Sequence, residues 1–505
     1  MKLQLYNTYS KRLENFTPLD PSNIRIYACG PTVYDLIHIG NARPIVVFDL
    51  LVRLMRYLYP RVTYVRNITD VDDKINLKAR ENNEKIDKLT SRTIKLFHED
   101  ALALCSLKPD IEPRATKHIH EMIEMIRTLL DNGHAYLSEG HVIFSVPSMP
   151  EYGKLSGRKL EEMIDGARVE VASYKKNPAD FILWKPSKSD DIGWDSEFGR
   201  GRPGWHIECS AMSAKYLGER FDIHGGGLDL IFPHHENEIA QSCCAFKSKM
   251  MAQIWMHNGY VTVDGDKMSK SLGNFVTVRD ALEKFPGEVV RYSLLSGHYR
   301  SPIDFSFKGL KEAKLSLDRL YRAISTYDKS NDFDDEFIKA LTKDLNTPEA
   351  FARLHELAKE ANKGSELSAQ KLFTCGKLIG LFNNNPLNWF KEKVNDDGKK
   401  IIDILPPLQI MEQLLINIIV IGFFLLSLSL ATGIVFIYDI FEQHLTHKTV
   451  LSILAWIIYA ILLWGRWSFG WRGKRIINWV LGGFLTLLLA YVGSKFALEF
   501  IFHRI

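Results

Sequence analysis

Short apolar runs alternate with amphipathic segments in the first part of the chain. Ile24–Ala28 and Val62–Arg66 are short, mostly apolar runs, which favours strands. Between them, Asn41–Leu58 carries its apolar residues on one helical face. A strand, a helix and a second strand in this order form a βαβ unit, so we predict an α/β domain with a parallel sheet covered by helices.

The pattern changes in the second part of the chain. From about Leu310 to Phe382 the apolar spacing is mostly helical, and Asn383–Asn385 with Pro386 interrupts it. Val394–Lys400 is polar and indicates a linker. Pro406 and Pro407 would end any helix before the last segment begins. We therefore predict an α/β domain with insertions over 1–305, a helical bundle over 306–392, a linker over 393–410 and a separate segment over 411–505.

The last segment contains three long runs without a charge. Leu414–Tyr438 has 25 such residues, Thr449–Gly465 has 17 and Ile476–Ser494 has 19. A helix needs about 20 apolar residues to cross a bilayer. The alternative is a set of buried core helices, but three such runs are hard to bury in so short a unit. We predict transmembrane helices at 414–438, 449–465 and 476–494. Tryptophans lie at or near their ends, as in an aromatic belt: Trp456, Trp464, Trp467, Trp471 and Trp479.

The charges locate the compartment. The 505 residues include 64 basic and 60 acidic side chains, a net charge of +4. Seven basic and four acidic residues lie in 411–505, so that segment holds +3, and overall charge does not indicate whether the rest binds nucleic acid. The Arg466–Arg475 loop has four basic residues and no acidic one, which predicts a cytoplasmic loop in the inner membrane and a cytoplasmic N-terminal part. Met1–Asp20 lacks the apolar core of a signal peptide, and six cysteines are too few for a disulfide framework.

Two segments have the composition of phosphate-binding elements. His38–Asn41 follows the first predicted strand and opens a helix, whose free N–H groups would attract phosphate. The plainer alternative is an ordinary helix cap. Lys267–Ser271 places two lysines in a loop flanked by glycines, and lysines suit the charge stabilisation of phosphoryl or adenylyl transfer. The alternative there is a solvated surface loop.

A third segment could hold a metal. If a helix starts at Pro233, His234 and Glu238 are four residues apart and share a face. With Cys29 and Cys209 they would make a zinc set, although no C-x-x-C spacing supports it. The alternative is a surface ion pair.

Taken together, these segments resemble the class I aminoacyl-tRNA synthetases, and closely the cysteinyl-tRNA synthetases, from about Leu3 to Phe390. His38–Asn41 corresponds to the HIGH element with Asn in the last place, and Lys267–Ser271 matches the KMSKS element completely. Further matching segments are Tyr64–Lys74, Arg202–Ser213, Asp222–Gly227 and Asp344–Ala350.

The resemblance implies a Rossmann-like catalytic domain that activates cysteine with ATP and Mg²⁺ and transfers it to tRNA(Cys). The sequence does not determine the oligomeric state, and we favour a monomer. It implies ATP binding by His38, Gly40, Asn41, Lys267, Ser269 and Lys270, of which His38, Asn41, Lys267 and Lys270 would be catalytic. It implies an amino-acid pocket of Cys29, Gly30, Thr69, Trp205 and His224. It implies one zinc ion, selecting the cysteine thiolate, on Cys29, Cys209, His234 and Glu238.

The tail resembles another family, of membrane proteins related to cytochrome c assembly and haem handling. Pro406–Glu412, His447–Ser452 and Gly465–Gly473 carry this resemblance. His447 is either a haem ligand or a polar interfacial residue. We expect two truncated proteins joined near Ile401–Pro407, by gene fusion or as a deletion or assembly artefact, without the anticodon-reading domain of the synthetases. The alternatives are a ligase that joins cysteine to an amino sugar and a membrane-anchored cysteine or zinc binding protein.

Overall fold

The chain divides into two compact units, 1–395 and 396–505. The computed structural model describes residues 2–158, 173–188, 191–268, 274–324, 332–390, 408–436, 446–471 and 474–490. The two units are considered separately below.

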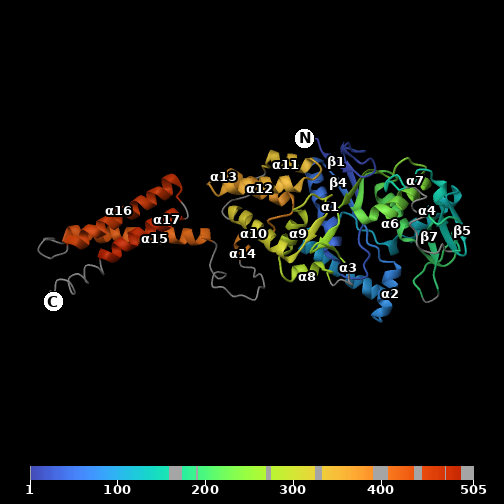
Figure 1. Ribbon diagram of the computed structural model, residues 1–505, viewed down its shortest axis with the longest axis horizontal. Helices are drawn as coiled ribbons and strands as arrows, with labels where there is room; N and C mark the ends of the chain where they lie inside the picture. The colour runs from blue at the N-terminus through green and yellow to red at the C-terminus, as the bar shows by residue number, and fades with distance from the viewer. Residues whose placement is uncertain are drawn as a thin grey trace. The chain divides into compact units, whose positions relative to one another are not determined.

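A parallel sheet lies at the centre of the first unit, in the order β10–β9–β3–β4 (Figure 1). Its strands are β3 (Ile24–Ala28), β4 (Val62–Arg66), β9 (Phe221–Gly227) and β10 (Ala252–Asn258). Ile24 pairs with Val62 and Ala28 with Arg66, in parallel register. α1 (Ile39–Leu58) joins β3 to β4 and begins two residues before the predicted helix. The predicted βαβ unit is therefore confirmed.

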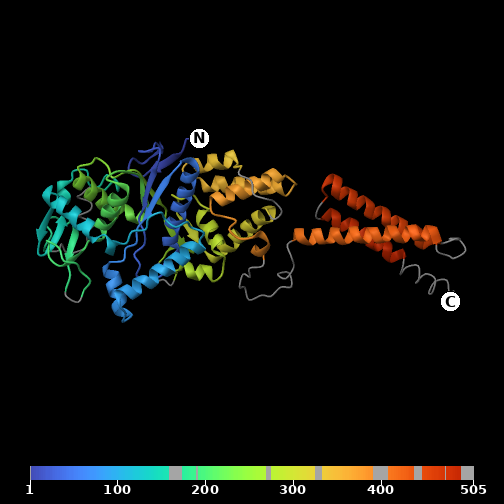
Figure 2. The ribbon, with the colours of Figure 1, turned by 180° about the vertical axis from the view of Figure 1, so that it is seen from behind.

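An antiparallel layer and a helical bundle lie on opposite sides of this sheet (Figures 1 and 2). The antiparallel sheet has the order β5–β6–β7–β8, and its strands are β5 (Ala135–Ser138), β6 (His141–Phe144), β7 (Phe181–Pro186) and β8 (Gly201–Pro203). The helices near it are α4 (Ile119–Asp131), α6 (Trp205–Leu217) and α7 (Glu236–Phe246). The short turns are η1 (Ala115–Lys117), η2 (Val146–Ser148), η3 (Leu228–Leu230) and the π-helical η4 (Ile231–His235).

Smaller elements complete the sheet side of the unit. The strands are β1 (Gln4–Asn7), β2 (Arg12–Asn15), β11 (Val261–Val263), β12 (Asp266–Lys267) and β13 (Ile303–Phe305). The helices are α2 (Asp73–Glu81), α3 (Ile86–Ala103), α8 (Val278–Leu282) and α9 (Gly287–Leu295). α1 packs against α9, which in turn packs against the bundle, so one apolar core runs from the sheet into the bundle.

The bundle confirms the predicted helical pattern. It consists of α10 (Phe307–Ile324), α11 (Asp335–Thr342), α12 (Thr347–Ala361), α13 (Glu366–Leu378) and the short α14 (Pro386–Trp389). The buried Trp389 stacks on Tyr321 with ring centroids 4.2 Å apart, and its indole N–H donates to Asp318 at 2.6 Å. Glu288 accepts the backbone N–H groups of Phe382 and Asn383 at 2.6 and 3.1 Å. These contacts tie the end of the first unit back onto α9 and α10.

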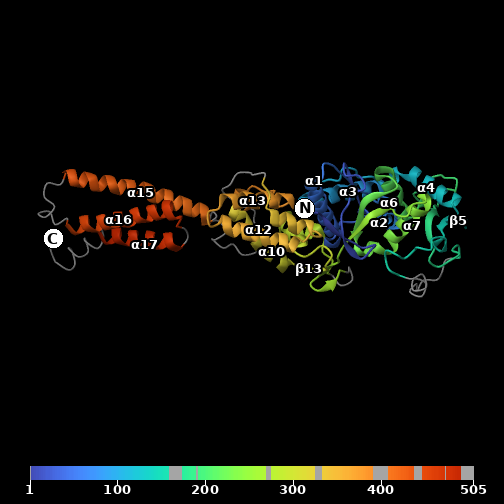
Figure 3. The same ribbon diagram turned by 90° about the horizontal axis from the view of Figure 1, so that it is seen from above.

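In the described part of the second unit, three helices lie side by side (Figure 3). They are α15 (Leu408–Phe436), α16 (Thr446–Phe469) and α17 (Lys474–Leu488). α16 packs against both others, and the Trp456 indole donates to the Ser427 hydroxyl of α15 at 2.7 Å. A small apolar cluster lies between them, whereas many large apolar side chains on their outer faces are exposed.

Two of the three predicted spans match helices of sufficient length. Leu414–Gly433 and Thr449–Phe469, with 20 and 21 residues, are long and apolar enough to cross a membrane. The apolar part of α17, Arg475–Leu488, is shorter. The predicted span 476–494 extends beyond the described residues, so it is not confirmed. The predicted linker, Val394–Lys400, also lies outside the described residues.

Candidate metal and nucleotide site

Four metal-ligating side chains meet at the carboxyl end of β3. Cys29 follows β3, Cys209 lies in α6, His234 in η4 and Glu238 in α7. One ligand atom of each lies within 4.8 Å of the others. This is the same group of four that the synthetase resemblance implies, and it is brought together from four separate elements.

The spacing of these atoms fits a tetrahedral zinc ion. With zinc–sulfur bonds of about 2.3 Å, two sulfurs in a tetrahedron lie about 3.8 Å apart. The Cys29 and Cys209 sulfurs are 3.7 Å apart, and Cys29 Sγ lies 3.4 Å from Glu238 Oε1. His234 Nε2 lies 3.0 Å from the same carboxylate oxygen. Two thiols, an imidazole and a carboxylate are a zinc-type donor set.

A second group of four shares two of these residues. Cys29 and Glu238 also lie within 4.8 Å of ligand atoms of His224 and His235. His235 Nε2 is 3.3 Å from Cys29 Sγ, and His224 Nε2 is 2.9 Å from Glu238 Oε2. The first group has two sulfur ligands and the second has one, and zinc favours the group with more thiolates.

The sequence predicts His234 and Glu238 on one face of a helix that starts at Pro233, but the helix starts later. Helical geometry from Pro233 would have aligned the two residues, but α7 begins at Glu236, after the π-helical turn. Phe232, before Pro233, has extended backbone angles (φ −137°, ψ 130°), because a residue before proline avoids the helical region. The two side chains nevertheless meet, at 3.0 Å.

Three further histidines, which the sequence interpretation missed, surround the group. His206 Nδ1 lies 2.9 Å from His234 Nδ1, which leaves Nε2 of His234 directed at Glu238. His257 Nε2 lies 2.7 Å from His235 Nδ1, and His257 Nδ1 lies 2.9 Å from the Thr8 hydroxyl. Such partners fix the orientation of metal-ligating imidazoles. Burial lowers the pKa of both His206 and His257 to about 3, so both are neutral at neutral pH.

The electrostatics of the four ligands favour a cation. Burial alone would raise the pKa of Glu238, but His224 and His234 hold it well below its usual range. The hydrogen bond from Cys29 lowers the pKa of the Cys209 thiol to about 6. Burial opposes protonation of His234, yet Glu238 and Cys209 raise its pKa to about 10. At neutral pH the four residues therefore hold a carboxylate, a thiolate and a protonated imidazole in a buried position. A divalent cation would displace the proton of His234 and compensate both negative charges.

Besides Cys29, the residues predicted for the amino-acid pocket contact one of the four ligands, lie next to one in the chain, or contact such a neighbour. Gly30 donates its N–H to Asn67 Oδ1 at 2.8 Å, and a Cβ there would lie 1.6 Å from the Asn67 carbonyl oxygen. The Thr69 hydroxyl donates to Glu208 Oε2 at 2.8 Å. The half-exposed Trp205 stacks on His234 with centroids 4.2 Å apart. His224 contacts the Tyr27 carbonyl oxygen and Glu238, which is one of the four ligands.

The predicted nucleotide turn opens α1. His38 is the N-cap of this helix, its Nδ1 accepts the Asn41 N–H at 3.3 Å, and the Asn41 side chain accepts the His38 N–H. A Cβ on Gly40 would lie 2.9 Å from the Met268 methyl carbon, so glycine lets the two predicted nucleotide elements meet. The turn is therefore a helix cap and is also in contact with the start of the KMSKS element.

The remaining nucleotide residues are only partly described. Lys267 pairs with Thr262 across β12 and β11. Ser269 and Lys270 lie outside the described residues, so their predicted roles stay predictions.

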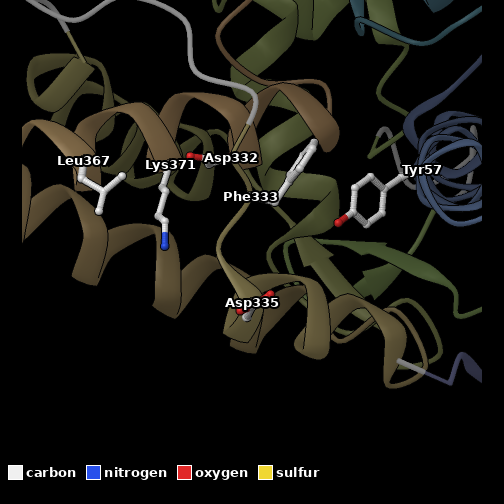
Figure 4. A pocket seen from close by; sticks show the side chains of 6 residues that line it. All are labelled: Tyr57, Asp332, Phe333, Asp335, Leu367 and Lys371. Atoms are coloured by element: carbon white, nitrogen blue, oxygen red, sulfur yellow. The ribbon is translucent and has the colours of Figure 1, made fainter.

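A surface pocket of about 540 Å³ lies elsewhere, at the opposite end of α1 (Figure 4). Its lining residues are Tyr57, Asp332, Phe333, Asp335, Leu367 and Lys371. The Tyr57 and Phe333 rings lie next to each other in its lining (Figure 4), with centroids 4.6 Å apart and their planes tilted by 56°. α1 has 20 residues, so this pocket is about 30 Å from the His38 end and is separate from the metal group.

The chain matches known families over most of its length. Residues 15–315 match the tRNA synthetases class I (C) catalytic domain, and 336–384 match the DALR domain. A cysteine–tRNA ligase of Beijerinckia indica is 56% identical over 396 residues, which cover 77% of this chain and 86% of that protein. The chain belongs to the cysteine–tRNA ligase family. Another member, from Gluconobacter oxydans, is 57% identical over 395 residues, 78% of this chain and 87% of that protein.

The fold and the tail agree with this membership and add to it. A methionyl-tRNA synthetase of Mycobacterium tuberculosis, solved with methionyl-adenylate, covers 71% of this chain and 89% of its own with a TM-score of 0.50. At 14% identity this likeness shows the class I synthetase fold alone. Residues 367–502 match the Cytochrome C assembly protein family, which confirms the predicted second resemblance of this cysteine–tRNA ligase family member.

Proposed function

We propose that this chain joins cysteine to tRNA(Cys) in two steps, of which the first consumes ATP. In the first, the cysteine carboxylate attacks the α-phosphorus of ATP·Mg²⁺ and pyrophosphate leaves. In the second, a terminal ribose hydroxyl of the tRNA attacks the carbonyl carbon and AMP leaves. The observation that carries the proposal is the group of Cys29, Cys209, His234 and Glu238 at the edge of a class I synthetase sheet, near the His38–Asn41 turn.

The same four residues would hold one zinc ion. Bound there, zinc would supply a Lewis acid for the substrate thiolate, a bond that the hydroxyl of serine makes poorly. Gly30, Thr69 and Trp205 would surround the substrate. Because the competing amino acid cannot make the sulfur bond, the site would reject it without a separate editing reaction.

The nucleotide part would act by charge and position. The N-terminus of α1 offers free N–H groups to phosphate, and His38 with Asn41 shapes that turn. Lys267 and Lys270 would stabilise the negative charge of the transition state. In the first step no side chain has to transfer a proton, because a carboxylate is already the nucleophile.

Cysteine-dependent ATP–pyrophosphate exchange by the full chain in detergent tests the first step. We expect exchange with cysteine and much less with serine. Product analysis with tRNA(Cys) and with an amino sugar as acceptors tests the second step, and the DALR match favours tRNA. Exchange without any charging of tRNA would overturn the tRNA assignment, and the absence of exchange would support a non-catalytic cysteine or zinc binding protein.

Metal content tests the zinc assignment independently of activity. We expect about one zinc per chain in the wild type and loss of that zinc in Cys209→Ser. Cys243→Ser is the matched control, since Cys243 is also buried but is not in either metal group. Equal zinc content in the two variants would contradict the assignment.

The second unit would anchor the enzyme in a membrane. Its helices expose large apolar side chains such as Ile418, Phe424 and Leu481, at 65%, 68% and 58% of their surface. Exposed Trp467 near the end of α16 and Arg475 near the start of α17 would lie at the membrane interface. We expect the full chain to float with phosphatidylcholine vesicles at high salt. Cleavage at Arg466–Arg475 by a protease added to the cytoplasmic side alone would support the predicted orientation. Cleavage there only by a protease added from outside would contradict it.

A further inference from the structure

The described residues on both sides of 269–273 contact the His38–Asn41 turn. On the entry side, Met268 contacts Gly40, as described above. On the exit side, the Phe275 ring packs edge-on against the His38 ring with centroids 5.2 Å apart. The described residues before and after 269–273 therefore both contact the His38–Asn41 turn.

Backbone hydrogen bonds strengthen the exit side. The Ile39 N–H donates to the Val276 carbonyl oxygen at 3.1 Å, and the Val278 N–H donates to the Ile37 carbonyl oxygen at 3.0 Å. Thr277 then caps α8 in a reciprocal pair with Asp280. Whatever holds α8 in place consequently also holds the exit of the loop against the nucleotide turn.

Arg279 holds α8 on α3 through three contacts. Its Nη2 donates to Glu99 Oε2 at 2.6 Å and to the Leu96 carbonyl oxygen at 3.3 Å. Its Nε lies 2.6 Å from Asp100 Oδ1. One guanidinium therefore spans about one turn of α3, from Leu96 to Asp100, which a single-point contact would not do.

The burial of Asp100 separates this cluster from an ordinary surface ion pair. Exposed pairs stabilise proteins little. The Asp100 side chain is 1% exposed, so loss of Arg279 would leave a buried carboxyl group without its counter-charge. Burial raises the pKa of Asp100 to about 6, in spite of Arg279, which agrees with a site that needs the cation.

We propose that Arg279 is a positioning residue for ATP activation. By fixing α8 to Glu99 and Asp100 of α3, it keeps the exit of the Lys267–Ser271 element on the His38–Asn41 turn. Arg279 itself does not contact ATP, and it lies outside the metal groups. The inference rests on the proposed cysteine activation.

Steady-state ATP–pyrophosphate exchange by the full chain in detergent tests the inference. Arg279→Ala should raise the KM for ATP about tenfold while the KM for cysteine stays at the wild-type value, because displaced loop residues lose their alignment with phosphate. The double variant Arg279→Ala/Asp100→Asn should be no worse than Arg279→Ala, since the two residues act through one contact.

Arg56→Ala is the matched control. Arg56 is 35% exposed, as Arg279 is, and both its contacts are to Asp110, near the other end of α1. It should leave both KM values unchanged. If Arg279→Ala does not fold, Glu99→Gln, which keeps the Asp100 contact, should give a smaller rise in the KM for ATP.

The outcomes distinguish the inference from the proposed function. Active wild type with an unchanged KM for ATP in Arg279→Ala, or in Glu99→Gln where that variant replaces it, would overturn the positioning role alone. Equal rises in the KM values for ATP and cysteine would also overturn it, because they would indicate general loosening. Absence of exchange in the wild type would overturn both.

Discussion

At the scale of single residues, Gly30 shows how closely the backbone is packed beside the metal group. A Cβ at this position would lie 1.6 Å from a backbone oxygen of Asn67, which a rotamer change cannot relieve. We expect Gly30→Ala to lower the free energy of unfolding by about 3 kcal/mol or more and to raise the KM for cysteine. Thermal unfolding in detergent and exchange kinetics measure these effects.

Gly309→Ala serves as the control for that substitution. At Gly309, in the first turn of α10, a Cβ would meet only the Ser306 hydroxyl, at 3.3 Å, which accepts the Gly309 N–H at 3.0 Å. Alanine should therefore be neutral or stabilise the chain by up to about 1 kcal/mol. Similar losses in the two variants would show that the close approach at Gly30 is not the cause.

The buried pair of Asp49 and Arg291 joins α1 to α9. Arg291 Nη2 lies 2.5 Å from Asp49 Oδ2, and both side chains are almost fully buried. Burial alone would raise the pKa of Asp49, but Arg291 and Arg53 hold it below its usual value. A carboxyl whose pKa is lowered by folding stabilises the fold above its unfolded pKa of about 3.9, and that stabilisation is lost as pH falls through the folded value.

Asp49→Asn should therefore cost about 3–5 kcal/mol at pH 7. The difference from wild type should become smaller below about pH 4, where wild-type Asp49 also gains a proton. Urea unfolding in detergent at pH 7, 5 and 3.5 measures it. Glu336→Gln, which removes an exposed pair with Lys339, should change stability by less than about 1 kcal/mol. A pH-independent difference between wild type and Asp49→Asn would contradict the argument.

At the scale of elements, Asp344 connects the bundle to the sheet side. It lies between α11 and α12 and accepts the Tyr6 N–H of β1 at 2.8 Å. The Tyr299 hydroxyl and Arg300 Nε also donate to it, at 2.8 and 2.7 Å. Asp344→Ala should cost about 3–5 kcal/mol, since it leaves buried donors unpaired, and should increase hydrogen exchange in β1. Asp335→Ala, at the exposed start of α11, should cost less than about 1 kcal/mol, and equal losses would contradict this role.

The elements that the sequence predicted are those formed by local pattern. β3, α1 and β4 follow from alternating apolar runs, and the bundle follows from helical spacing. The metal group could not be derived from spacing, because its four ligands come from separate elements that only the fold brings together. The resemblance supplied it.

The sequence indicated least clearly the residues that support the ligands or the nucleotide turn from outside. A single histidine such as His206 or His257 within an apolar segment has the appearance of a core residue. The adjacent His234 and His235 were the one sequence signal for a histidine cluster. Both lie in the π-helical turn before α7, so regular helical spacing does not predict where their side chains point. Arg279 was not predicted because its partners, Glu99 and Asp100, are distant in the chain.

At the scale of the whole molecule, the matches pass from a synthetase family to a membrane protein family, and the two matches overlap at 367–384. The DALR match ends at 384, and the match to the Cytochrome C assembly family extends to 502. We therefore predict equal charging of tRNA(Cys) and of a variant with a substituted anticodon, both more weakly than by a cysteine–tRNA ligase that reads the anticodon. Charging assays with the full chain measure this. A tRNA with a substituted acceptor end is the control and should not be charged, whereas strong anticodon discrimination would contradict the prediction.

The tie of Trp389 to Tyr321 and Asp318 has a mechanical consequence. A force drawn through the tail, from a moving bilayer or from a crowded neighbour, reaches the enzyme at the end of α14. The contacts at that point are the stacked rings of Trp389 and Tyr321 and the indole hydrogen bond to Asp318. Glu288 of α9 also binds the backbone of Phe382 and Asn383. We therefore expect a pull on the end of α14 to break these contacts before it displaces the residues of the metal group.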